Sequence, residues 1–66
     1  MTSEILIVDD NSDIRELISN ILRDKGFKIR EAANFDQAIN EINKKIPDVA
    51  IIDVKLDRVI MMVLNY

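Results

Sequence analysis

The chain has 66 residues, of which 48% are hydrophobic and 32% charged, and it contains neither cysteine nor histidine. Its length limits it to one small domain or part of one, and the missing residue types exclude a disulfide scaffold, a thiolate zinc site and histidine acid–base chemistry. A net charge of −3 argues against a nucleic-acid-binding surface. With no apolar run long enough to cross a bilayer and no cationic, apolar leader, we expect a cytoplasmic protein without membrane contact.

The first third of the chain predicts a strand followed by a helix. Residues 5–8 are apolar at every position, which is typical of a parallel-sheet strand covered on both faces. Apolar residues then recur with helical spacing at positions 14, 17, 18, 21 and 22. Residues 11–13 offer capping side chains at the start of this helix, and Lys25 with Gly26 suits its end.

The next segments predict a second strand, a second helix and a third strand. Residues 27–31 alternate apolar and charged, as in a strand near a sheet edge. Asn34 and Gln37 have capping-box spacing, apolar positions 35, 38, 39, 42 and 46 mark a helical face, and Pro47 ends it. Residues 49–52 are a second continuous apolar run. The order β-α-β-α-β predicts an α/β fold with a parallel sheet.

Acidic residues follow both continuous apolar strands. Asp9 and Asp10 come after the first, and Asp53 comes after the third. If the strand order is 2-1-3, these carboxylates converge beyond the carboxyl ends of the strands, where open α/β sheets bind ligands. They repel one another unless a hard cation such as Mg²⁺ is present, and a carboxylate beside Mg²⁺ can attack phosphorus. Any one of them taken alone is also typical of a turn or a helix cap.

The residues around these acids resemble a known family. Ile-Leu-Ile-Val-Asp-Asp-Asn at 5–11 and Pro-Asp-Val-Ala-Ile-Ile-Asp-Val-Lys-Leu at 47–56 look like the first half of a response-regulator receiver domain, particularly of the NtrX type. The resemblance covers about residues 4–57 and implies a flavodoxin-like doubly wound sheet of order 2-1-3. It also implies that Asp53 is the phosphoacceptor and that Mg²⁺ is held by Asp9, Asp10, Asp53 and the backbone carbonyl of Lys55. Phosphorelay signalling with a sensor histidine kinase, rather than enzymatic activity, is the role it implies.

The chain departs from the family after residue 57. The hydroxyl residue after the fourth family strand and the lysine after the fifth are absent, so we expect a partial receiver domain at 1–57 with impaired phosphoryl transfer. Residues 58–66 form a hydrophobic tail outside the family pattern. The NtrX-type continuation Gly-Asp-Asn-Asp-Gly-Ile-Glu-Leu-Leu, in an AT-rich encoding read one base later, gives residues 59–66. We therefore hypothesise a frameshift, and an unrelated tail is the alternative.

Two other functions compete with a phosphorelay receiver. The chain could be a non-functional relic or an interaction fragment, because a third strand without a next neighbour leaves an open apolar edge that favours self-association. Residues 59–64 could cover that edge by folding back antiparallel through a turn at 56–58. A mononucleotide-binding half-sheet is disfavoured, because no glycine-rich loop follows the first strand.

Overall fold

The computed structural model of the chain describes residues 3–53 and 60–63. Its elements, in chain order, are β1 (Glu4–Asp9), α1 (Ser12–Asp24), β2 (Lys28–Ala32), α2 (Phe35–Lys44), β3 (Val49–Asp53) and β4 (Ile60–Val63). The predicted β-α-β-α-β succession is confirmed, with β2 beginning one residue later than the alternation suggested.

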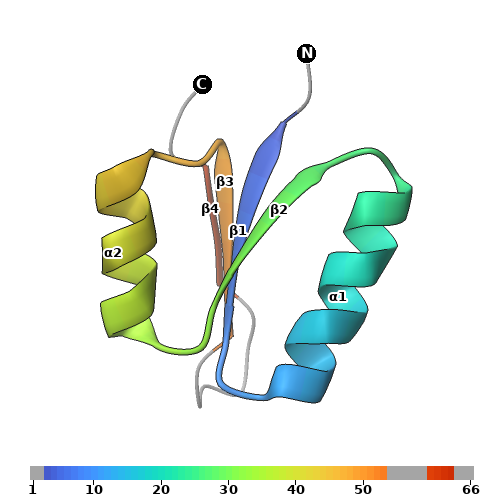
Figure 1. The fold of residues 1–66 in the computed structure, drawn as a ribbon, viewed down its shortest axis with the longest axis horizontal. Coiled ribbons are helices and arrows are strands. Elements are labelled where there is room, and N and C mark those ends of the chain that lie inside the picture. Colours follow the sequence, from blue (N-terminus) through green and yellow to red (C-terminus); the bar gives the residue numbers. More distant parts are fainter. Residues whose placement is uncertain (1–2, 54–59, 64–66) are drawn as a thin grey trace.

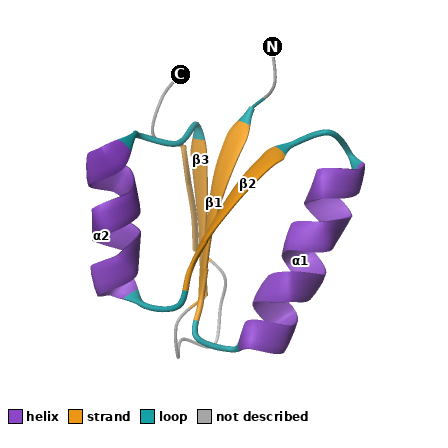
Figure 2. Ribbon diagram, viewed as in Figure 1, coloured by secondary structure: helices purple, strands orange, loops and turns teal. Residues whose placement is uncertain are grey.

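All the strands belong to one sheet with the order β2-β1-β3-β4. β1 pairs in parallel with both β2 and β3, which confirms the predicted order 2-1-3. Helices α1 and α2 lie on opposite sides of this sheet (Figures 1 and 2). Because β1 and β3 are parallel neighbours, their carboxyl ends lie at the same end of the sheet. The strand order also reverses at β1, and open α/β sheets bind ligands at such a point.

The central strand β1 is buried along its whole length. Successive strand residues point to opposite faces, so Leu6 and Val8 share one face while Ile5 and Ile7 share the other. The cluster around the first pair contains Ala38 of α2, with Ile42 packed against it, and Ala32, Ala50 and Ile52 complete it. Burial on both faces is what the unbroken apolar run predicted.

Side chains and one glycine fix the helix ends as the sequence suggested. The Asn11 side chain accepts hydrogen bonds from the backbone N–H groups of Asp13 and Ile14, so Asn11 is the N-cap of α1. At its other end Gly26 adopts φ +94° and its N–H donates to the carbonyl of Arg23, an arrangement that a side chain would strain.

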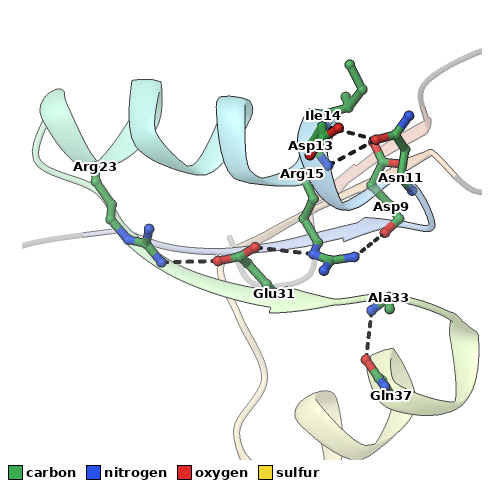
Figure 3. A network of polar contacts seen from close by, with 9 residues as sticks. All are labelled: Asp9, Asn11, Asp13, Ile14, Arg15, Arg23, Glu31, Ala33 and Gln37. Carbon is green, nitrogen blue, oxygen red and sulfur yellow. Dashed lines mark hydrogen bonds and ion pairs between the residues drawn. The ribbon is translucent and has the colours of Figure 1, made fainter.

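The cap of α2 is a variant of the predicted capping box. The backbone N–H of Gln37 donates to Asn34 Oδ1 at 2.8 Å, as expected. The Gln37 side chain, however, accepts from the backbone N–H of Ala33 rather than from that of the cap residue (Figure 3). The Gln37 side chain thus binds the backbone one residue before the cap.

The apolar stripes predicted for the two helices are only partly buried. On α1, Ile18 and Leu22 are half-buried, whereas Ile14, Leu17 and Ile21 are exposed. The second stripe divides in the same way, with Ala38 buried and three large residues exposed: Phe35, Ile39 and Ile46. Each helix therefore covers the sheet with one side of its stripe and presents the other side outward.

The outer edge of β3 is paired, which corrects the expectation of an open third-strand edge. β4 runs antiparallel to β3, from Val49 opposite Val63 to Ile52 opposite Ile60. The sequence allowed residues 59–64 to fold back in this way, and the structure shows the antiparallel pairing for residues 60–63. The turn suggested at 56–58 lies outside the described residues. Among the described strands, β2 and β4 are the ones that lie at the sheet edges.

Candidate functional site

The site begins with two carboxylates on neighbouring strands. Asp9 ends β1, Asp53 ends β3, and the parallel register places the two residues directly opposite each other. Asp10 follows in the turn that leads into α1. The structure therefore confirms that the ends of the first and third strands lie next to each other.

Asp9 is the buried member of the group, with 3% of its surface exposed. Its Oδ1 accepts a hydrogen bond of 2.9 Å from the backbone N–H of Asn11. Its Oδ2 is buried and has no hydrogen-bond partner among the described residues. A buried carboxylate oxygen without a partner is unfavourable by about 1–3 kcal/mol or more, so this atom fits a position that a cation would occupy.

The other predicted ligands are less enclosed. Asp10 is exposed and Asp53 is half-buried, while Lys55 lies outside the described residues. Within residues 3–53 and 60–63, no three acidic side chains are grouped so that they could hold a metal ion. The structure thus brings Asp9 and Asp53 together as strand neighbours and does not show the expected convergence of all three carboxylates.

A cation that sequence reasoning missed lies beside this group. Arg15, in the first turns of α1, donates from Nη1 to the backbone carbonyl of Asp9 at 2.7 Å. Its Nε donates to Glu31 of β2 at 3.2 Å, and the other oxygen of Glu31 accepts from Arg23 at 3.3 Å (Figure 3). The available signal was helical spacing, because Arg15 lies three and seven residues before Ile18 and Leu22, on the side that meets the sheet.

A second charged cluster lies away from the acids, at the start of β1. Arg30 of β2 donates to the backbone carbonyls of Glu41 and Lys45 at 2.7 and 2.6 Å, and it forms an ion pair with Glu4 at 2.9 Å. A hydrogen bond from Lys44 is the main cause that lowers the pKa of Glu41, and Arg30 adds to this effect against the cost of desolvation. These contacts fasten the end of α2 to the sheet.

Comparison with known proteins identifies the family. The profile of the response regulator receiver domain matches residues 5–61. The chain belongs to this receiver family. The match extends into the segment predicted as a separate tail, so the domain boundary at residue 57 stays a prediction.

Three curated relatives illustrate the similarity. The chain is 38% identical over 53 residues to the phosphate regulon transcriptional regulatory protein PhoB of Escherichia coli, which covers 80% of the chain and 23% of PhoB. It is 43% identical over 53 residues to an NtrX-like response regulator of Rickettsia bellii, covering 80% of the chain and 11% of that protein. It is 38% identical over 56 residues to sporulation initiation phosphotransferase F of Bacillus subtilis, covering 85% of the chain and 45% of that protein.

The receiver chain therefore spans less than half the length of these relatives. The NtrX-type resemblance is confirmed by the similarity to NtrX-like proteins. No solved structure is a significant match to the chain. Neither helix among the described residues has the length and apolar character that crossing a membrane requires.

Proposed function

We propose that this receiver chain accepts a phosphoryl group on Asp53 from a sensor histidine kinase, and that it does so beside a Mg²⁺ ion held by Asp9, Asp10, Asp53 and the Lys55 carbonyl. One observation carries the proposal. Asp9 lies opposite Asp53 at the end of a parallel strand pair, and its buried Oδ2 has no partner in the part of the chain that the structure describes. Oxygen ligands of this kind suit Mg²⁺, which binds few carboxylates and keeps several waters.

In this reaction the Asp53 carboxylate is the nucleophile. One of its oxygens forms a bond to phosphorus while the bond between phosphorus and the nitrogen of a phosphorylated kinase histidine breaks. The electron pair of that bond leaves with the imidazole, which takes a proton from solvent. Mg²⁺, when bound, supplies positive charge that offsets the charge of the acids and of the phosphoryl oxygens. The half-buried position of Asp53 leaves it within reach of a donor.

We expect the transfer to be slow. In the family, a hydroxyl residue and a lysine from later strands bind the phosphoryl oxygens, and both belong to parts of the family pattern beyond the match at residues 5–61. Loss of one such oriented donor commonly lowers a rate by about 10²–10³-fold. The chain would then function as the acidic half of a phosphorelay receiver, which is a signalling rather than an enzymatic role.

A Mg²⁺ titration followed by amide chemical shifts tests the metal site. We expect weak binding at millimolar Mg²⁺, with shifts at Asp9, Asp10 and Asp53 that disappear in Asp10→Asn and Asp53→Asn. Asp24→Asn is a matched control, because Asp24 is the last residue of α1, at the end of the helix away from the acids, and the substitution removes the same charge. Unchanged amide shifts in the wild-type chain would rule out the site.

Labelling with a small phosphodonor tests the acceptor. We expect a low yield of acid-stable, base-labile label on the wild-type chain and none on Asp53→Asn. Equal labelling of both proteins would show that another residue reacts. Complete labelling of the wild type within minutes would instead show that the later hydroxyl and lysine are dispensable.

An interaction fragment is the second candidate, and the exposed stripes of α1 and α2 favour it. Apolar side chains gathered on the outside of a small domain mark surfaces that associate. In this case the chain self-associates or binds a partner in a Mg²⁺-independent manner, and Asp53→Asn has no effect. The pairing of β3 with β4 moves any edge-to-edge contact from β3 to the outer edge of β4. Sedimentation at low micromolar concentration with and without Mg²⁺ separates the two candidates.

A further inference from the structure

We propose that Arg15 is a positioning residue of the acidic site, which it serves by fixing the peptide that joins Asp9 to Asp10. This inference deepens the proposed Mg²⁺ site and rests on it for its functional meaning. The bond that carries it is the 2.7 Å hydrogen bond from Arg15 Nη1 to the carbonyl oxygen of Asp9. No role in the phosphoryl-transfer step itself is assigned to Arg15.

Two hydrogen bonds hold the backbone between Asp9 and Asn11. The Arg15 guanidinium holds the Asp9 carbonyl, and the backbone N–H of Asn11 donates to Asp9 Oδ1 at 2.9 Å. A peptide unit is planar, so fixing the carbonyl of Asp9 also fixes the direction of the Asp10 N–H and the point from which the Asp10 side chain departs. Arg15 therefore constrains the backbone position of Asp10, whose side chain is exposed.

The guanidinium is itself held in place. Its side chain is 19% exposed, and its Nε is paired with Glu31 of β2 at 3.2 Å. Arg23 pairs with the other oxygen of Glu31 at 3.3 Å, so β2 and α1 are joined at two points (Figure 3). An arginine fork that is anchored on one side gives a fixed direction to the donor on its other side. Arg15 thus links the fold of α1 on the sheet to the geometry at the end of β1.

Charge and position have opposite effects on metal affinity, which makes the role testable. A permanent positive charge beside the acids disfavours a second cation, so removing it without other change would strengthen Mg²⁺ binding. Loss of positioning would weaken binding, because removing a group that orients metal ligands typically lowers metal affinity by about 10–100-fold. The sign of the change therefore distinguishes the two roles.

The experiment compares Arg15→Gln with Arg23→Gln in the full chain. Both substitutions remove one positive charge and one contact to Glu31, but only Arg15 contacts Asp9. We expect Arg15→Gln to lower Mg²⁺ affinity by about tenfold or more and to shift the Asp10 and Asn11 amides in metal-free protein. Arg23→Gln should leave the Mg²⁺ affinity within about twofold of the wild-type value. It should also leave the Asp10 and Asn11 amide shifts of the metal-free protein unchanged. Urea unfolding of each variant shows whether the folded fraction is preserved.

Arg15→Lys covers the case in which Arg15→Gln does not fold. Lysine keeps the charge but not the fork, so we expect the metal-free amides of Asp10 and Asn11 to shift although the charge is unchanged. Equal or tighter Mg²⁺ binding in folded Arg15→Gln, or amides that stay in place in Arg15→Gln and Arg15→Lys, would overturn the inference. If the wild type binds no Mg²⁺, the proposed function fails, and the metal-free amides alone decide whether Arg15 positions Asp10.

Discussion

Matched core and surface substitutions test the division of apolar residues between the sheet and the outer helix faces. Leu6 of β1 is completely buried, whereas Leu17 of α1 is 56% exposed. Replacing a buried leucine with alanine lowers the free energy of unfolding by about 2–5 kcal/mol. The whole free energy of unfolding of a domain of this length is only about 3–10 kcal/mol. We therefore expect Leu6→Ala to remove a large part of the stability or all of it.

Leu17→Ala should have a much smaller effect. Full burial of a leucine side chain contributes about 1.5–3 kcal/mol, so a side chain that is more than half exposed contributes roughly 1 kcal/mol or less. Alanine also favours a helix slightly more than leucine does, which offsets part of this loss. The losses in the two leucine variants should differ by at least about 1 kcal/mol if the outer face of α1 is free in solution.

Urea unfolding at low micromolar concentration, followed by circular dichroism, measures both free energies. If Leu6→Ala is unfolded without urea, Ile7→Val and Ile21→Val replace the pair, because Ile7 is buried and Ile21 is 48% exposed. A buried isoleucine-to-valine change lowers stability by about 0.5–1.5 kcal/mol, which a marginal domain tolerates. Equal losses at core and surface positions would refute the reasoning and show that the outer face of α1 is covered in solution.

Three further predictions follow from caps, charge and the sheet edge. Asn34→Ala should lower the free energy of urea unfolding by about 1 kcal/mol through loss of the cap of α2, and Asn34→Asp should restore it. The pKa of Glu41 is lowered from its ordinary value of 4.5, so its contribution to stability is present above pH 4.5 and is lost as the pH falls through the folded-state value. Glu41→Gln should therefore flatten the curve of unfolding free energy against pH in that acidic range. A curve identical to that of the wild type would contradict this prediction. A chain that ends at Asp57 leaves β3 without β4, so it should sediment as larger species than the full chain does at equal concentration.

Local chemistry made the strands and the helix ends predictable from the sequence. The unbroken apolar run of β1 indicates burial on both faces, and Asn11, Gly26 and Asn34 fix helix ends through bonds that involve only nearby residues. Such features do not depend on which distant element packs nearby. The motif of acids after strands was equally visible, because the end of a strand is a local property.

Features that depend on tertiary packing were not predictable in the same way. The stripe on α1 is wider than its contact with the sheet, so periodicity could not tell that Ile18 faces inward while Leu17 faces outward. Arg15 was overlooked because a charged residue in a helix is normally assigned to the solvent side, whereas its long side chain reaches the end of β1. The pairing of β4 was foreseen only as one option, since residues 59–64 have no periodicity that selects an element.

The register between β1 and β3 joins the stability of the fold to the geometry of the acids. Ile7 lies opposite Ile51 and Asp9 opposite Asp53 in one continuous ladder. A slip by one residue would turn every β3 side chain to the other face, which would expose Ile52 and move Asp53 away from Asp9. The same burial that holds Ile52 in the core therefore holds the two carboxylates side by side. Substitutions that weaken this ladder should reduce stability and Mg²⁺ binding together, whereas substitutions on the outer face of α1 should leave the acidic site intact.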